Sequence, residues 1–278
     1  MDYGQDMAFG ASLYNDASPD ILGVPNAQAD FWDMQEFADN CEPTAESFII
    51  RQFGYDNIST NDFAYISHAN GWYQPGSGTS PENMGDMMDL FGIGNHTNTD
   101  ATIQDLAHEL SQGHGVVVGV RSDQLWEQGP LQDLWNWIKE QFGFDTPDWS
   151  PADHAVSVTG IQKAEDGSVM VILNDPGDPL GAGHAYPLDR FMDAWENSSF
   201  RMTATNDPLP AFAEQLRQAE SSGGIDWTGF ANSVHEIAEP IVSIAGDVAC
   251  VIGAVAGAVV SFNTLSDALS GDDYALWI

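Results

Sequence analysis

The segment from residue 154 to residue 175 constrains the fold of this chain more than any other part of the sequence. Two apolar runs, "HAVSVTGI" (154–161) and "VMVILND" (169–175), flank the polar stretch "KAEDGS" (163–168). Apolar runs rich in β-branched residues that flank an Asp-Gly turn are typical of a β-hairpin. The sequence therefore predicts an antiparallel sheet that contains this hairpin.

The open end of the predicted hairpin carries an imidazole and a carboxylate. If the turn is centred near residues 165 or 166, the position opposite His154 falls near 176 to 178, within one or two positions of Asp175. Diagonal neighbours in an antiparallel pair are within side-chain reach. A carboxylate there would fix the tautomer of His154 and favour its charged form. Strand alternation puts only one of Asn174 and Asp175 on the face of His154.

A second informative segment, "FWDMQEFADNCEPTAESFII" (31–50), surrounds the first of the two cysteines. Apolar residues recur at helical spacing after it, so we predict a helix from Cys41 to near Gly54. The D-x-x-E pattern of Asp39 and Glu42 predicts a capping box at the start of this helix. Unpaired N–H groups and the helix dipole favour the thiolate of a cysteine at such a position.

Gln35 lies just ahead of this predicted helix, six residues before Cys41. Its side-chain amide can donate a hydrogen bond to an oxyanion, with the backbone N–H of Cys41 as the second donor. The helix start, the hairpin end and this glutamine would together form an acyl-transfer site. The candidate catalytic residues are therefore Cys41, His154, Asp175 and Gln35.

The rest of the chain alternates helical and strand patterns. We predict a helix over 102–115, a strand over 116–120 and a further helix over 131–143. After about residue 207 the composition shifts towards Ala, Ser, Gly and Val. We therefore expect an α+β protein with an irregular N-terminal arm (1–30), a central domain (31–206) and a helical C-terminal region (207–278).

The charge of the chain excludes several classes of partner. Lys and Arg total 7 against 42 Asp and Glu, which gives a formal net charge of −35. Such a chain is not expected to bind nucleic acid or anionic membranes through charge. Two cysteines are too few for a disulfide framework, and the histidines lack zinc-ligand spacing, so we expect no metal and no cofactor. No Lys or Arg precedes Arg51, so we expect no Sec signal peptide and either a cytoplasmic protein or export by another route.

The stretch "IVSIAGDVACVIGAVAGAVVSF" (241–262) has the length of a membrane span. Its Ala, Gly and Ser residues contribute little transfer energy, no basic residue flanks it, and Asp247 is costly inside a bilayer. We favour a buried helix or a self-association face over membrane insertion, which remains the alternative.

The ordered motifs resemble those of the papain-like cysteine peptidases, most closely their C39-like, bacteriocin-processing branch. The resemblance runs over residues 31 to 206 and includes Q-x5-C followed by Pro and Thr, "DHAVSVTGI", "VMVILNDP" and "YPLDRFMDAW". It implies a helical lobe and an antiparallel sheet, and it implies a cysteine peptidase that acts on peptides or proteins without a cofactor. In these motifs Cys41 is the nucleophile, His154 the base, Gln35 the oxyanion donor and Asp175 the orienting group. The Asp-Pro pair favours Asp175 over Asn174 for the last role.

One residue departs from the pattern of the family. Glu42 stands where these peptidases usually have Gly, and a carboxylate beside Cys41 disfavours the thiolate by like-charge repulsion. This departure motivates a catalytically impaired binding module as an alternative. An acyltransferase of the same fold and a secreted effector or toxin are two further alternatives.

Overall fold

The computed structural model describes residues 14–16, 18, 20–126, 152–164, 166–210 and 212–213. Helical segments of the described chain are α1 (Pro25–Ala29), α2 (Cys41–Ile50), the π-helical turn η1 (Arg51–Tyr55), α3 (Thr60–Ala69), the 3-10 turn η2 (Pro81–Asn83), α4 (Asp86–Leu90), α5 (Ile103–Ser111), α6 (Ser122–Leu125) and α8 (Leu188–Glu196). Its strands are β1 (Ile21–Gly23), β2 (Tyr73–Gln74), β3 (Gly78–Thr79), β4 (Asn95–Asn98), β5 (His114–Val120), β6 (His154–Lys163), β7 (Val169–Asn174), β8 (His184–Pro187) and β9 (Met202–Pro208).

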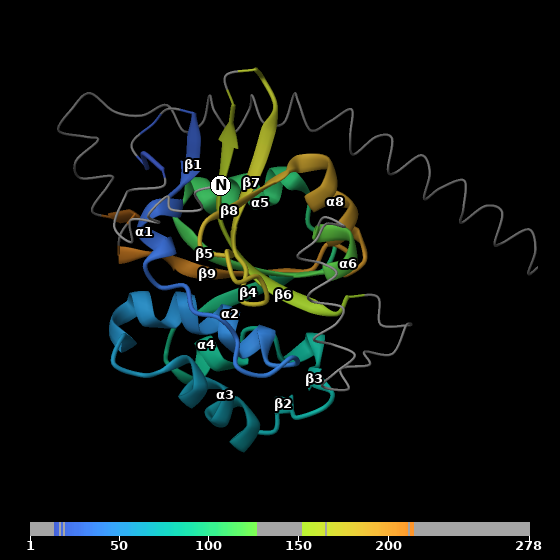
Figure 1. The fold of residues 1–278 in the computed structure, drawn as a ribbon. Helices are drawn as coiled ribbons and strands as arrows, with labels where there is room; N and C mark the ends of the chain where they lie inside the picture. The colour runs from blue at the N-terminus through green and yellow to red at the C-terminus, as the bar shows by residue number, and fades with distance from the viewer. Residues whose placement is uncertain are drawn as a thin grey trace, which may run out of the picture. The chain divides into compact units, whose positions relative to one another are not determined.

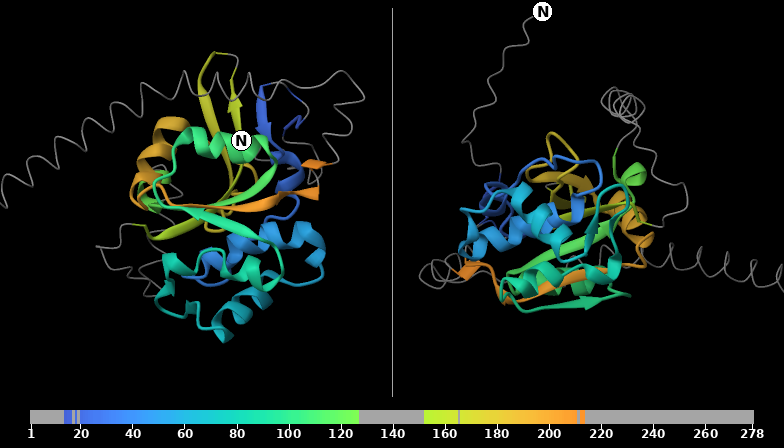
Figure 2. Two further views of the ribbon diagram at one scale, coloured as in Figure 1. Left: turned by 180° about the vertical axis from the view of Figure 1, so that it is seen from behind. Right: turned by 90° about the horizontal axis from the view of Figure 1, so that it is seen from below.

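A large antiparallel sheet dominates the described chain (Figure 1). Its strands follow the order β4-β9-β5-β6-β7-β8, and β1 pairs separately with β6. Figure 2 shows β9, drawn in orange, alongside β4 and β5, to both of which it is paired. The predicted α+β class is confirmed.

Strands β6 and β7 form the predicted hairpin. Ser157 pairs with Asn174 and Val158 with Leu173, after which the register shifts by one residue before Gly160 pairs with Ile172. This β-bulge leaves Thr159 without an opposing residue, and bulges of this kind bend a strand and increase its twist. Extrapolated towards the open end, the register puts Gly177 opposite His154, as the hairpin pattern predicts.

Helix α2 begins at Cys41, as predicted, and its last turn runs into η1, where Gly54 has a φ of 103°. Only glycine adopts this conformation readily, so the helical path ends there. The predicted capping box is wrong. The residue before the helix is Asn40, whose side chain makes no capping bond. Asp39 instead accepts hydrogen bonds from the Tyr73 hydroxyl and the Gly76 N–H, which ties it to the β2–β3 hairpin.

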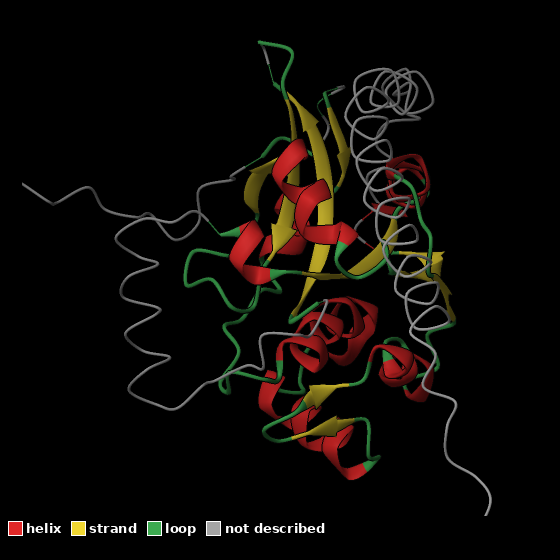
Figure 3. Ribbon diagram, turned by 90° about the vertical axis from the view of Figure 1, so that its right-hand side faces the viewer, coloured by secondary structure: helices red, strands yellow, loops and turns green. Residues whose placement is uncertain are grey.

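Helix α2 lies between the sheet and helices α3 and α4 (Figure 3). Its residues Phe48, Ile49 and Ile50 have no exposed surface. Complete burial of such a side chain stabilises the fold by roughly 1.5–3 kcal/mol. The last turn of α2 is therefore anchored in the hydrophobic core.

Part of the N-terminal arm is more regular than the sequence predicts. Residues 21–23 form β1, which pairs with Gly160–Gln162 of β6, and α1 follows directly. Ile21 and Leu22 are apolar and buried, and the free edge of β6 beyond β5 supplies their hydrogen-bonding partner. A run of three residues is too short for periodicity to detect.

Other predicted elements are partly covered by the described residues. The predicted helix over 102–115 and strand over 116–120 correspond to α5 and β5. The predicted helix over 131–143 lies outside the described residues, as does most of the C-terminal region 207–278 with the stretch 241–262. Among the residues that the structure does describe, no helix combines the length and the hydropathy that a membrane span requires.

Candidate active site

Three element ends meet at the candidate site. Cys41 is the first residue of α2, His154 the first residue of β6, and Asp175 directly follows β7. Helix α2 packs on β6, and β6 pairs with β7, so the topology brings these ends together. All three residues are buried or nearly so.

His154 and Asp175 form a buried pair. Nε2 of His154 lies 2.6 Å from Oδ1 of Asp175, which also accepts the N–H of Gly177 at 2.8 Å. The indole N–H of Trp126 donates to Oδ2 of Asp175 at 2.8 Å. Asn174 points elsewhere, because its amide bonds the carbonyl of Gln28. Asp175, and not Asn174, therefore faces the imidazole.

The electrostatic surroundings favour the imidazolium form of His154. Burial lowers the pKa of His154, but the charge and hydrogen bond of Asp175, together with the hydrogen bond and charge of the Cys41 side chain, raise it well above its usual range. Burial raises the pKa of Asp175, yet the charge and hydrogen bonds of His154, Trp126 and Gly177 bring it below its usual value. With Nε2 bonded to Asp175, Nδ1 is the ring nitrogen left for the thiol.

Gln35 sits in a clamped loop beside this pair. Its backbone N–H donates to the carbonyl of Pro176 at 2.9 Å, and Nε2 donates to the carbonyl of Phe37 at 2.8 Å. The N–H of Phe37 in turn donates to Oδ1 of Asn40 at 3.1 Å. An amide NH2 has two N–H bonds. One of them holds the loop, so a single N–H of Gln35 remains for an oxyanion.

Two tryptophans support Asp175. Trp126 supplies the N–H to its carboxylate, and its ring lies edge-on to the imidazole of His154, with 5.4 Å between centroids. The indole N–H of Trp32 donates to the backbone carbonyl of Asp175 at 2.7 Å. The sequence motifs include neither Trp32 nor Trp126 among the site residues. Only the strand register could have placed Trp126 near the site. Val120, the last residue of β5, pairs with His154, and Trp126 follows shortly after it in the chain.

Gly177 is a further residue that the motifs do not mark. A methyl group added at this position would lie 2.9 Å from Cε1 of His154 and 3.0 Å from the Trp126 ring. The backbone of residue 177 therefore packs directly against the imidazole. Asp175, Trp126 and Gly177 together fix the orientation of the ring.

Glu42 is not a surface carboxylate beside the nucleophile. It is 7% exposed and contacts Glu46, which is fully buried one helical turn later. Burial, followed by the charge and hydrogen bond of Glu46 and the charge of Cys41, raises the pKa of Glu42 well above its usual value, against a hydrogen bond from Thr79 that lowers it. These surroundings favour the neutral form of Glu42, which would add no negative charge beside Cys41.

Other tryptophan and histidine side chains of the chain have structural roles or lie outside the described residues. Trp195 is fully buried, and its N–H donates to the carbonyl of Arg201. His184 bonds Asp178 at 2.6 Å and stacks on Tyr186, so it packs within its loop. Trp149 lies outside the described residues. No cluster of three or more potential metal-ligating side chains occurs in the described part of the chain.

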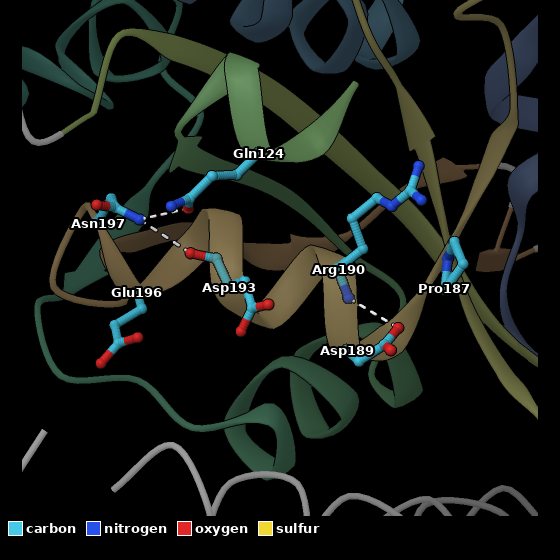
Figure 4. Close-up of a pocket in the computed structure, with 7 residues that line it drawn as sticks. All are labelled: Gln124, Pro187, Asp189, Arg190, Asp193, Glu196 and Asn197. Atoms are coloured by element: carbon cyan, nitrogen blue, oxygen red, sulfur yellow. Dashed lines mark hydrogen bonds between the residues drawn. The ribbon is translucent and has the colours of Figure 1, made fainter. Parts of the chain in front are cut away.

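A polar hollow lies along α8, and its lining includes none of the candidate catalytic residues (Figure 4). Its lining carries carboxylates and amides but neither cysteine nor histidine, and consists of Gln124, Pro187, Asp189, Arg190, Asp193, Glu196 and Asn197. Asn197 spans it by donating to Gln124 at 2.6 Å.

Residues 21–203 match the model of the Peptidase_C39 like family, and the chain belongs to that family. The predicted relationship to the C39-like peptidases is thereby confirmed. Uncharacterised proteins of Mycobacterium bovis and Mycobacterium tuberculosis are 26% identical over 219 residues, which cover 70% of this chain and 88% of theirs. A solved Bacillus anthracis chain assigned as a C39-like peptidase is 15% identical, with a TM-score of 0.42 over 68% of this chain and 98% of that one.

Replacing Trp126 with phenylalanine is expected to lower stability by about 1–2 kcal/mol, because the buried Asp175 oxygen loses its N–H donor while the ring remains. The carboxylate would then stabilise the imidazolium of His154 less well, and the pKa of His154 should fall. Chemical denaturation and NMR titration of the histidine ring protons measure the two effects. A Trp195→Phe variant, which loses an N–H bond in the core, should be destabilised without a change in the His154 titration.

Proposed function

We propose that this protein is a cysteine peptidase that cleaves peptide bonds with Cys41 as nucleophile, His154 as general base and acid, Asp175 as orienting carboxylate and Gln35 as oxyanion donor. The observation that carries the proposal is the buried His154–Asp175 pair at 2.6 Å, close enough to Cys41 at the start of α2 for its side chain to raise the pKa of His154. Membership of the Peptidase_C39 like family supports the same class of chemistry.

The acylation step follows from these roles. His154 holds the proton of Cys41, and the thiolate attacks the carbonyl carbon to form a C–S bond. The carbonyl oxygen becomes an oxyanion, which the free N–H of Gln35 and the backbone N–H of Cys41 stabilise. The C–N bond then breaks, and the imidazolium of His154 gives its proton to the leaving amine, which leaves a thioester on Cys41.

Deacylation reverses the proton movements. Water gives a proton to the neutral imidazole as its oxygen attacks the thioester carbonyl. The C–S bond breaks, a carboxylic acid leaves, and the thiolate–imidazolium pair is restored. Asp175 stays ionised throughout and stabilises the imidazolium each time that it forms. These steps need only residues of this chain and water.

The proposal predicts that cleavage depends entirely on the sulfur of Cys41. Incubation of a peptide library with the wild-type protein should give new termini detectable by mass spectrometry, and Cys41→Ala should give none. Cys250→Ala removes the only other thiol of the chain and serves as the matched control, which should cleave like the wild type. Equal cleavage by Cys41→Ala and wild type would exclude the mechanism.

The acyltransferase and binding-module alternatives are tested in the same assay. With added glycinamide, an acyltransferase would yield peptides extended by the amine in place of free acids, because the amine replaces water in the second step. A binding module would retain peptide in a pull-down and release no products. The peptidase proposal predicts free acids as the main products.

A further inference from the structure

Two carboxyl groups lie side by side next to the nucleophile. Glu42 and Glu46 are four residues apart on α2, a spacing that places side chains together on one helix face. They are 7% and 0% exposed, and a buried charge normally needs a partner. Among the described ion pairs with Lys, Arg or His, none includes either glutamate. Some other arrangement must therefore accommodate both groups.

Glu46 has the surroundings of a carboxylate. Its Oε1 accepts the N–H of Gly85 at 2.5 Å, and its Oε2 accepts the N–H of Met88 at 3.1 Å. Two backbone donors, one on each oxygen, stabilise the ionised form. Burial raises the pKa of Glu46, and the charge of Asp86 at the start of α4 adds to this, although the hydrogen bonds of Glu42 and of the two backbone N–H groups lower it. Its contacts thus make Glu46 the better place for a negative charge.

Glu42 has the surroundings of a neutral acid. Its Oε1 is buried and lacks a conventional hydrogen-bond partner among the described residues. The groups that face its carboxyl are Glu46 and Cys41 on the same helix and the hydroxyl of Thr79 on β3. A protonated carboxyl has an O–H to donate, and the carboxylate of Glu46 can accept it. One shared proton therefore turns a repulsive contact into a hydrogen bond.

We propose that Glu42 and Glu46 share a single proton held on Glu42, so that Glu42 is a positioning residue that stands beside the Cys41 thiol as a neutral acid. Its consequence for catalysis rests on the proposed peptidase function. The charge of Cys41 acts on three neighbouring side chains, those of His154, Glu42 and Tyr73. A neutral Glu42 leaves the thiolate–imidazolium pair intact, whereas a carboxylate there would disfavour the thiolate.

Infrared spectroscopy tests the protonation state directly. Free Glu and Asp side chains ionise near pH 4, so the C=O stretch of a carboxyl that stays protonated at pH 7 should stand out and shift in D2O. The wild-type protein should show this band and Glu42→Gln should lack it. Glu36→Gln, which removes an exposed carboxylate from the loop before α2, should retain it. Absence of the band from the wild-type protein at pH 7 would overturn the proposal, and this reading needs no variant.

Thiol reactivity provides a second reading. In a Cys250→Ala background, Cys41 is the only thiol. The rate of its alkylation by iodoacetamide should rise with pH in the same way for the parent and for Glu42→Gln, within about twofold. If Glu42 were ionised, removing its charge would move the rise to lower pH by about one unit, a tenfold change in rate at fixed pH on the rising limb. That shift, seen with Glu42→Gln and not with Glu36→Gln, would refute the shared proton.

Stability against pH provides a third reading. Because the pKa of Glu42 is raised in the folded state, the folded protein holds a proton that the unfolded chain releases above about pH 4.5. The free energy of unfolding should therefore fall as pH rises from there to the folded pKa, and Glu42→Gln should remove this slope. If the free energy of unfolding changed with pH in the same way for the wild type and for Glu42→Gln, the proposal would be contradicted. None of the three readings requires cleavage activity, so a failure of the peptidase proposal alone leaves them unchanged.

Discussion

Replacing Asp175 with alanine is expected to destabilise the protein by about 3–5 kcal/mol and to reduce cleavage below detection. The carboxylate is fully buried and holds three donors, so its removal leaves His154, Trp126 and the N–H of Gly177 without their acceptor. Loss of one partner of a buried pair typically costs this much, because the remaining group is left uncompensated. Urea denaturation measures the stability, and the peptide assay measures the turnover.

The same variant should change the pH dependence of stability. The pKa of His154 is raised on folding, so its contribution is complete below about pH 6.5 and is lost as pH rises through the folded pKa. The pKa of Asp175 is lowered, so its contribution is present above about pH 3.8 and is lost as pH falls through the folded pKa. In Asp175→Ala, the free energy of unfolding should therefore change less with pH, both below about pH 3.8 and above about pH 6.5.

Glu109 offers a matched control for Asp175→Ala. It is a buried carboxylate that bonds two histidines, His96 at 3.3 Å and His114 at 2.5 Å, near the opposite end of β5. Glu109→Ala should destabilise the protein while it leaves turnover per folded molecule unchanged. Equal losses of turnover per folded molecule in both variants would show that Asp175 acts only through stability.

Replacing His154 with alanine is expected to lower turnover by about 10²–10⁴-fold, the usual contribution of a general acid–base group. It should also lower the alkylation rate of Cys41 at neutral pH, because the thiolate loses the imidazolium that stabilises it. The cost in stability should be smaller than for Asp175→Ala, since Asp175 keeps the N–H donors of Trp126 and Gly177. Steady-state kinetics and iodoacetamide labelling measure these effects.

His114 serves as the control for His154. Its Nδ1 also lies within hydrogen-bond distance of a carboxylate, Glu109, at 2.5 Å. His114→Ala should therefore remove a comparable pair and leave both turnover and Cys41 alkylation unchanged. If the two histidine variants lost reactivity equally, the assignment of His154 as the base would fail.

The sequence predicted the elements that carry the site because their patterns are local. An apolar helix start at Cys41 and an Asp-Gly turn between two apolar runs each leave a signature within a few residues. The hairpin register then limits which acid can reach His154, and the structure puts Asp175 there. Family membership agrees with the order of these motifs along the chain.

The parts that the sequence missed depend on contacts between distant residues. Asp39 and Glu42 form a capping-box pattern in the sequence. In the structure, however, the side chain of Asp39 bonds the β2–β3 hairpin and that of Glu42 is buried next to Glu46. The bulge at Thr159 has no signature in an uninterrupted apolar run. The role of Trp126 follows from the pairing of β5 with β6, which no pattern near residue 126 records.

The loop before α2 and the turn after β7 are joined by two hydrogen bonds, from Trp32 to the carbonyl of Asp175 and from Gln35 to the carbonyl of Pro176. These bonds hold Gln35 and Asp175 close together, although 140 positions of chain separate the two residues. Moving the helical layer away from the sheet at this point would break both hydrogen bonds at once. We therefore expect Gln35 and Asp175 to keep their relative positions when a peptide binds.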